Sequence, residues 1–220
     1  MVSHDQLEQD EKETSRTEAF SDGVFAIAIT LLVLELKVPS REAALAKGGL
    51  QRALLGQWAM YLAFLTSFAT VLVMWVNHHA LFTHIRRSRL PFLYLNGLLL
   101  FFVTLIPFPT AILAGYIGSG EEPLAVKIYA AICVAICVAF NLLWHYASHG
   151  GRLLDRHADM DQVRAITRQY YFGPPLYAVA FVLAFSHAIA SLVLCILLAL
   201  FFAFTGWVRK DHQAAPLRRN

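Results

Sequence analysis

Six long apolar segments divide this chain and restrict its fold more than any other feature. They lie at about residues 19–37, 53–76, 91–115, 124–147, 170–186 and 188–208. A membrane-spanning helix needs about 20 apolar residues, whereas a barrel strand needs roughly 10 in an alternating pattern, so these runs are too long for strands. Only 15% of the residues are charged, against about 25% in soluble domains. We therefore predict one all-α domain over residues 1–220, a polytopic membrane protein with six transmembrane helices.

The last two segments form one apolar run that is too long for a single helix. From Tyr170 to Val208 it covers 39 residues, which as one helix would be about 58 Å long. Two spans joined by a tight turn near Ser186 and His187 fit the membrane better. The pair Pro174–Pro175 would then lie in the first turn of the fifth helix, where proline is tolerated.

The basic residues predict the orientation of the six helices. With six spans, one side of the membrane receives thirteen of the 18 lysines and arginines. Because cytoplasmic loops carry the excess of basic residues, we expect both short termini in the cytoplasm. The thirteen are Lys12, Arg16, Arg86, Arg87, Arg89, Arg152, Arg156, Arg164, Arg168, Arg209, Lys210, Arg218 and Arg219.

The first apolar segment is short and has a charged residue at each end. It runs twelve residues from Gly23 to Leu34, between Asp22 and Glu35, and as a helix it would measure about 18 Å. A helix this short and this charged is poorly suited to face lipid. We expect other helices to shield it while one of its faces borders a polar path.

Helical spacing places an apolar stripe on one face of this first helix. At about 100° per residue, the stripe contains Phe20, Gly23, Ile27, Thr30, Leu31 and Leu34. It fits ordinary helix packing, or else rings of apolar side chains around a symmetry axis that restrict a pore by constriction and dewetting. The Thr30 hydroxyl could meet a passing ion or bond to its own backbone, as threonine often does in membrane helices.

Asp22 points away from that stripe, about 220° from Ile27. Three interpretations remain open: a helix-start carboxylate in solvent or at the cap, a buried structural anchor, or a proton relay. A carboxylate inside a membrane is costly unless it is paired and hydrogen-bonded, and Arg16 or a protonated histidine would compensate its charge. Donors are expected at the same depth on the next two helices: Trp75, Asn77, His78, His79, Tyr94 and Asn96.

Histidine pairs offer a metal site as an alternative. His145 and His149 share a helix face, but cationic side chains also suit the carboxyl end of a helix. The adjacent His78 and His79 point about 100° apart and need a partner helix to share one ion. No metalloprotease or nucleophile motif accompanies them, so no metal site and no enzyme activity are expected. The cysteines, Cys133, Cys137 and Cys195, lie in apolar runs without metal-type spacing.

The motifs of the first three helices resemble those of the transmembrane protein 175 family. The resemblance rests on R-x-x-x-F-S-D followed by GVFAIAITLLVLEL, on Trp75-Val76-Asn77-His78-His79, and on Asn96 with Pro107-Phe108-Pro109-Thr110. Animal members of the family are endosomal and lysosomal potassium channels with two repeats, and bacterial members have one six-helix unit. The single FSD motif here matches the bacterial form.

The resemblance implies a homotetramer in the cell membrane, with the first helix lining a central pore. It implies weakly selective potassium conduction without the TVGYG filter, a permeant K⁺ but no cofactor, and no nucleic-acid partner. Constrictions would fall on Ile27, Leu31 and Leu34, and a selectivity hydroxyl on Thr30. The residues that hold the first helix against the second and third would be Arg16, Phe20, Ser21, Asp22, Trp75, His78, His79 and Asn96. The alternatives are a histidine-based membrane metalloprotein or enzyme, and a proton-coupled transporter that uses Asp22.

Overall fold

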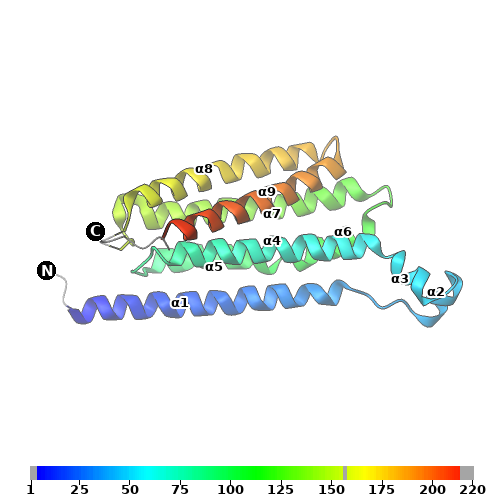
Figure 1. The fold of residues 1–220 in the computed structure, drawn as a ribbon, viewed down its shortest axis with the longest axis horizontal. Coiled ribbons are helices and arrows are strands. Elements are labelled where there is room, and N and C mark those ends of the chain that lie inside the picture. Colours follow the sequence, from blue (N-terminus) through cyan, green and yellow to red (C-terminus); the bar gives the residue numbers. More distant parts are fainter. Residues whose placement is uncertain (1–3, 156–157, 214–220) are drawn as a thin grey trace, which may run out of the picture.

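The fold is a bundle of long, roughly parallel and antiparallel helices (Figure 1). The computed structural model describes residues 4–155 and 158–213, with side chains for 11–155 and 158–203. Within these residues the chain is helical apart from turns and one isolated antiparallel bridge, Ile85–Leu154. The elements are α1 (His4–Leu31), η1 (Leu32–Glu35), α2 (Arg41–Ala46), α3 (Leu50–Leu55), α4 (Trp58–Phe82), α5 (Leu90–Thr104), α6 (Pro107–Tyr116), α7 (Glu122–Ser148), η2 (His149–Gly151), α8 (Met160–Leu183) and α9 (Ala188–Gln213).

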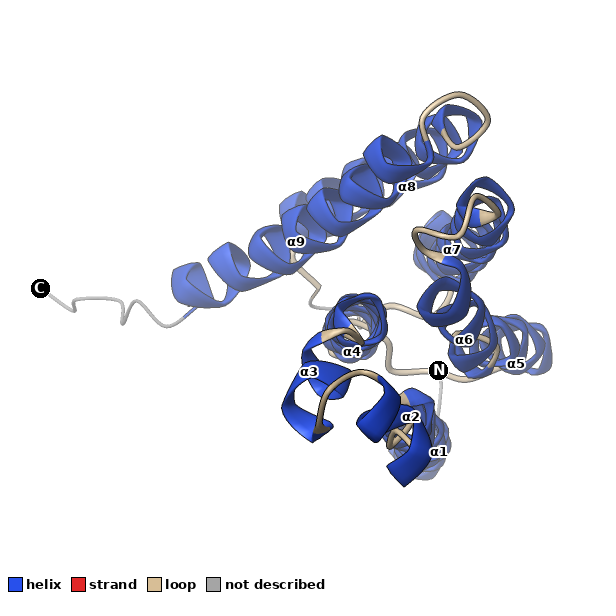
Figure 2. Ribbon diagram, turned by 90° about the vertical axis from the view of Figure 1, so that its right-hand side faces the viewer, coloured by secondary structure: helices blue, strands red, loops and turns tan. Residues whose placement is uncertain are grey.

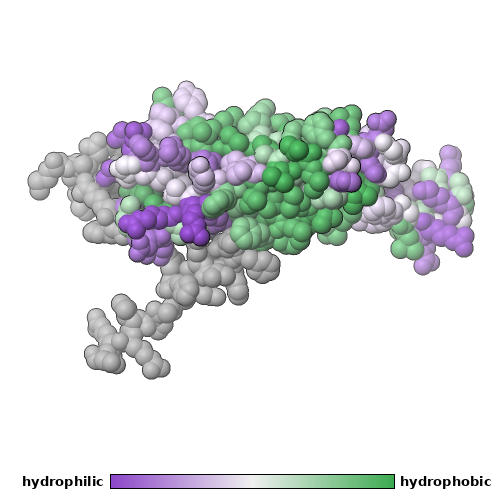
Figure 3. Space-filling model, turned by 90° about the horizontal axis from the view of Figure 1, so that it is seen from above, coloured by the Kyte–Doolittle hydropathy of each residue, from purple (hydrophilic) through white to green (hydrophobic). Residues whose placement is uncertain are grey.

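Four of the helical stretches are long and apolar enough to cross a membrane. They are Glu11–Glu35, Trp58–Phe82, Leu90–Tyr116 and Glu122–Gly151, and a shorter apolar helix covers Ala188–Ala203. Figure 3 shows the same pattern on the surface, an apolar middle with hydrophilic residues gathered toward both ends. The chain is therefore an all-helical protein with the character of a multi-pass membrane protein.

The first helix is longer than the predicted segment 19–37 because its polar start is also helical. The segment DQLEQDEKE is rich in helix-forming residues, and α1 extends for 28 residues, about 42 Å. Beyond Leu31 the backbone tightens into the 3₁₀ turn η1. The Lys37 ammonium group donates to the carbonyl of Leu34 at 2.8 Å, which satisfies one of the exposed carbonyls at this helix end.

The connection from α1 to α4 contains two short helices, α2 and α3. Ser40 caps α2, since its hydroxyl accepts the backbone N–H of Ala43 at 3.2 Å. Gly48 and Gly49 have φ of 79° and 116°, values that side chains rarely tolerate, and they turn the chain into α3. This connection, with its two short helices, extends to Gln57. The predicted segment 53–76 is therefore observed as α4, Trp58–Phe82, which begins and ends several residues later.

The predicted segment 91–115 is broken into α5 and α6 by prolines. Pro107 has no N–H to donate to the carbonyl of Val103, and the N–H of Ile106 donates there instead at 3.1 Å. Leu105 and Ile106 therefore separate α5 from α6. The predicted segment 124–147 is observed as α7 with nearly the same bounds, Glu122–Ser148.

The position of Pro174 and Pro175 contradicts the sequence-based expectation. Asp159 caps α8, its carboxylate accepting the Asp161 N–H at 2.9 Å, so the helix begins ten residues before the predicted Tyr170 and the prolines lie in its interior. Pro174 leaves the carbonyl of Tyr170 without its helical donor. The Asn141 side chain of α7 donates to that carbonyl at 2.9 Å, which is why the interior proline is accommodated.

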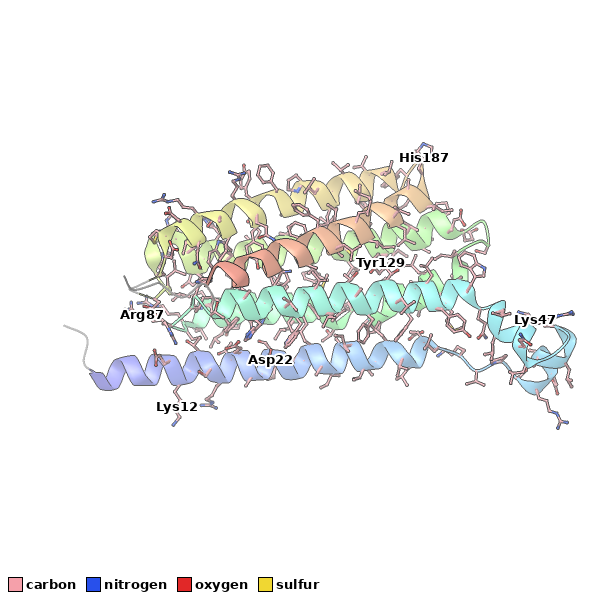
Figure 4. All side chains as sticks on the ribbon, in the orientation of Figure 1. Lys12, Asp22, Lys47, Arg87, Tyr129 and His187 are labelled. Atoms are coloured by element: carbon pink, nitrogen blue, oxygen red, sulfur yellow. The ribbon has the colours of Figure 1, made fainter. Side chains whose placement is uncertain are left out.

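A tight turn joins α8 to α9, with the N–H of His187 donating to the carbonyl of Leu183 at 2.8 Å. The predicted segment 188–208 is observed as α9, which extends to Gln213. Three of the basic residues counted for orientation, Arg156, Arg218 and Arg219, lie outside the described residues. Figure 4 shows Lys12 and Arg87 at one end of the bundle and Lys47 and His187 at the other.

The first helix lies at the edge of the bundle. Viewed along the helix axes (Figure 2), α1 is beside α4 and α5, while α7, α8 and α9 are farther away. One face of α1 and η1 contributes Phe25, Ala28 and Leu32 to a hydrophobic core shared with α4, α5 and α7. A second core joins α7, α8 and α9 through residues such as Tyr129 and Tyr177. The opposite face of α1 has no neighbouring helix in the described part of this subunit.

Candidate functional site

The two faces of α1 differ sharply in burial. Ser21, Phe25, Ala28 and Leu32 recur at helical spacing and are almost fully buried. On the opposite face, Ile27, Leu31 and Leu34 are 59%, 41% and 61% exposed. The predicted stripe therefore points out of the subunit, with Phe20, Gly23 and Thr30 also exposed along it.

Thr30 is placed on this exposed face with its hydroxyl proton already used. The hydroxyl donates to the backbone carbonyls of Ala26 and Ile27 at 3.0 and 2.9 Å. Its oxygen keeps lone pairs that can accept a hydrogen bond or contact a cation. The Thr30 hydroxyl can thus donate to its own helix backbone and still present its oxygen outward.

Three buried polar side chains join α1, α4 and α5 in a single directed chain. The Ser21 hydroxyl donates to the carbonyl of Thr17 at 2.8 Å, so its oxygen accepts the Asn96 side-chain N–H at 2.9 Å. Asn96 then presents its oxygen to Nε2 of His78 at 2.9 Å. These directions require His78 to carry a proton on Nε2.

Aromatic rings enclose His78 on the remaining sides. Its ring centroid lies 5.2 Å from that of Phe25, 4.6 Å from Phe82 and 6.5 Å from Phe140. His78 is fully buried, and its Nδ1 atom has no hydrogen-bond partner among the described residues. The imidazole therefore serves as a packed ring with one hydrogen bond, held between α1 and α7.

A second pair of contacts joins α1 to α4 nearer the surface. The Trp75 indole N–H donates to the Asp22 carboxylate at 2.9 Å, and Nδ1 of His79 lies 2.8 Å from the Glu18 carboxylate. Trp75 and His79 stack with their ring centroids 6.2 Å apart. Asp22 is partly buried and faces α4, on the side of α1 away from the exposed stripe (Figure 4). Glu18 was not singled out from the sequence, although it lies on the same helical face as Asp22.

Two of the expected anchoring residues do not join this network in the subunit. The Arg16 guanidinium is exposed and makes no ion pair or hydrogen bond with the described residues. Phe20 is exposed beside it on the stripe. The network that the structure brings together consists of Glu18, Ser21, Asp22, Trp75, His78, His79 and Asn96.

A further buried hydroxyl cluster holds α4 against α6 and α7. The Thr110 hydroxyl lies 2.7 Å from both the Ser67 hydroxyl and the Ile106 carbonyl, and the Tyr129 hydroxyl lies 3.4 Å from Thr70. Sequence reasoning missed this cluster. The available signal was the presence of Ser67, Thr70 and Thr110 in apolar segments, since hydroxyls buried there need hydrogen-bond partners.

The histidines do not converge on a common point. His78 and His79 turn to different partners, Asn96 and Glu18, and the rings of His145 and His149 lie 5.4 Å apart at the end of α7. Among the described residues, no group of three His, Cys, Asp or Glu side chains is placed to hold a metal ion.

Comparisons with known proteins identify similar chains. Residues 16–107 match the family model described as "Endosomal/lysosomal potassium channel TMEM175". A potassium channel of Chamaesiphon minutus is 53% identical over 194 residues, 88% of this chain and 95% of the relative. A potassium channel of Streptomyces collinus is 40% identical over 92% of this chain and 98% of that protein.

The fold is similar as well. The crystal structure of a lysosomal potassium-selective channel TMEM175 homologue from Chamaesiphon minutus superposes with a TM-score of 0.82. It has 50% sequence identity, and the match covers 89% of this chain and 98% of that one.

Proposed function

The chain belongs to the TMEM175 family, and from that premise we propose that it is a potassium-permeable channel whose pore is lined by the exposed stripe of α1. Family members and close relatives are channels rather than enzymes. The relatives from Chamaesiphon and Streptomyces are named potassium channels and match almost their whole length. K⁺ is accordingly the proposed permeant ion, in a membrane setting.

The exposed stripe on an edge helix is the observation that carries this proposal. Ile27, Leu31 and Leu34 are exposed on the surface of the subunit, while the opposite face of α1 is hydrogen-bonded to α4 and α5. In a single subunit the exposed face of α1 does not enclose a path for ions. Symmetric copies arranged around an axis would bring the stripes together, and the family suggests four copies.

Apolar rings limit permeation by a physical mechanism different from a carbonyl filter. A ring of branched side chains narrows the path and excludes bulk water, so a hydrated cation loses part of its shell when it passes. Potassium is dehydrated more easily than sodium because it is larger, which favours weak selection for potassium. The outward oxygen of Thr30 would offer a polar contact between the Ile27 and Leu31 rings.

The same proposal assigns six spans to the subunit. α1, α4, α5 with α6, and α7 supply four by length and composition. The remaining two would be α8 and α9, which form a tightly turned hairpin with its exposed apolar residues, such as Val179 and Val193, toward lipid. An even number of spans places the start of α1 and the end of α9 on the same side of the membrane. The excess of basic residues at that end supports a cytoplasmic position, in the cell membrane.

Ion flux through Ile27→Asn tests the pore assignment. The purified full chain in liposomes is expected to pass potassium faster than sodium. Ile27→Asn should hydrate the constriction and reduce the potassium-to-sodium ratio severalfold. The control is Val179→Asn, because Val179 is 58% exposed but lies on α8, away from the stripe. The proposed function fails if wild-type protein passes no potassium, and the Ile27 assignment fails if both variants keep wild-type selectivity.

A further inference from the structure

Lys37 lies just beyond the last turn of the helix that carries the exposed stripe. Its backbone N–H donates to the Met60 sulfur of α4 at 3.1 Å, and its ammonium group reaches back to the Leu34 carbonyl at 2.8 Å. Leu34 ends the stripe and is 61% exposed, and Lys37 is exposed beside it. The structure therefore holds one positive charge at the end of the stripe that is opposite the start of α1.

This charge has no carboxylate partner in the part of the chain that the structure describes. Glu35, two residues earlier, makes no ion pair with it there. The carboxyl end of a helix carries a partial charge of about −0.5, which attracts cations, and the Lys37 ammonium more than offsets this charge. The connection to α4 is basic as a whole, with two acidic and four basic residues: Glu35, Glu42, Lys37, Arg41, Lys47 and Arg52.

We propose that Lys37 lowers the rate at which K⁺ enters the pore from this end. The inference rests on the proposed function, because the end of α1 is a pore mouth only if the exposed stripe lines the pore. Symmetric copies of the chain place their ammonium groups at one level around the axis. The repulsion that each group exerts on an approaching cation adds to that of the others, so the local K⁺ concentration falls.

The attachment of Lys37 matters to this role as much as its charge. A lysine ammonium sits on a flexible four-carbon stem, but the bonds to Met60 and Leu34 keep this one at the helix end. At an ionic strength of about 0.1 M, charges in solvent act over only about 10 Å. A cation held at the mouth therefore affects a passing ion more than one farther along the connection.

Single-channel currents of the purified full chain in planar bilayers test the role of Lys37. Lys37→Gln keeps a donor for the Leu34 carbonyl but loses the charge. At about 0.1 M KCl it should raise the K⁺ current in one direction about threefold relative to the other, and Lys37→Glu should raise it further. The change should vanish at about 1 M KCl, where charges act over only about 3 Å. A purely structural defect would change both directions alike.

Two matched variants separate the position of the charge from its presence. Lys37→Arg keeps the charge and should keep the wild-type ratio of the two currents. Lys47→Gln removes a charge from the same connection, at the end of α2 and away from the end of α1 (Figure 4). It should also keep the wild-type ratio.

The outcomes distinguish this inference from the function on which it rests. A wild type without K⁺ current overturns both. If the wild type conducts but Lys37→Gln keeps its current ratio, or changes that ratio equally at about 1 M KCl, the role of Lys37 is wrong while the channel assignment stands. An equal effect of Lys47→Gln would likewise contradict a role for the position of Lys37.

Discussion

At the scale of single residues, hydrogen-bond direction explains why Ser21, Asn96 and His78 act as a unit. The hydroxyl of Ser21 is oriented by its own helix backbone, and this orientation decides which end of the Asn96 amide faces each neighbour. Each member has at least one partner, which lowers the cost of burying these side chains, although Nδ1 of His78 has no partner among the described residues. None of the three side chains can be replaced alone without leaving a neighbouring side chain short of a partner.

Asn96→Leu should therefore destabilise the subunit more than its size suggests. It strands the Nε2–H of His78 in a buried site and removes the donor to the Ser21 oxygen, and we expect a loss of about 2–4 kcal/mol. Thermal unfolding of the detergent-solubilised protein measures it. Asn77→Leu is the control, because the Asn77 amide donates to the Val73 carbonyl of its own helix. Equal melting temperatures for the two variants would show that the chain through Asn96 contributes nothing.

Asp22 is expected to tolerate loss of charge but not loss of its oxygen. Asp22→Asn keeps an acceptor for the Trp75 indole N–H and should cost at most about 1 kcal/mol, whereas Asp22→Leu removes the acceptor and should cost about 1–3 kcal/mol. Assembly and melting temperature distinguish the two variants. If Asp22→Asn alone abolishes assembly, the negative charge itself is required and the hydrogen-bond explanation is wrong.

At the scale of elements, prolines set the shapes of two helices, and the hydrogen bonds that they remove are replaced in different ways. Beside Pro107 and Pro109 the backbone supplies the donors, since the N–H groups of Ile106 and Phe108 donate to the carbonyls of Val103 and Leu105. In α8 the donor comes from another helix, because the Asn141 side chain of α7 donates to the Tyr170 carbonyl in place of the N–H that Pro174 lacks. A proline in one helix is thus matched by a polar residue on the next.

A double substitution in α7 and α8 tests this repair. Asn141→Leu should destabilise by about 1–3 kcal/mol, because it leaves the Tyr170 carbonyl unsatisfied at a partly buried position. Pro174→Ala restores the N–H that bonds the same carbonyl within α8. The pair should therefore recover most of the loss, and unfolding measurements on the two single variants and the double variant give the coupling energy. Strictly additive losses would disprove the link between Asn141 and Pro174.

At the scale of the whole molecule, the subunit is arranged as a shielded bundle with one exposed helix face. α1 is attached along one side by buried hydrogen bonds and by the core, while Ile27, Leu31 and Leu34 remain uncovered. A stripe this apolar requires either lipid or another copy as its environment. Because the stripe belongs to the helix with charged residues at both ends of its apolar run, we propose an axis between copies rather than lipid as its environment.

The proposed tetramer predicts a mass of four chains for the purified protein. Native mass spectrometry should give four times the 24.6 kDa chain mass. Oxidation of Ile27→Cys should link copies across the axis, because the stripes of different subunits face one another. Val179→Cys, with the same exposure on α8, should give no such links. A monomeric protein, or equal crosslinking of both variants, would contradict the central position of α1.

The amino-acid sequence by itself determined the helical membrane class, the two faces of α1 and the family motifs. Apolar periodicity acts locally along a helix, so it separates Asp22 from Ile27 without knowledge of neighbours. The order of the spans also placed Trp75, His78 and Asn96 at the depth of Asp22, because spans that return through a membrane bring their ends to the same level.

Only the tertiary structure decided which of these residues meet, and where the helices begin. Trp75 bonds Asp22 while His79 bonds Glu18, choices set by the rotation of α4 about its axis, which no local pattern encodes. The interior position of Pro174 depends on Asn141, a partner 33 residues away in the chain. The exposure of Arg16 could not be read from a motif, since a charge on α1 is paired or free according to what the neighbouring helices present to it.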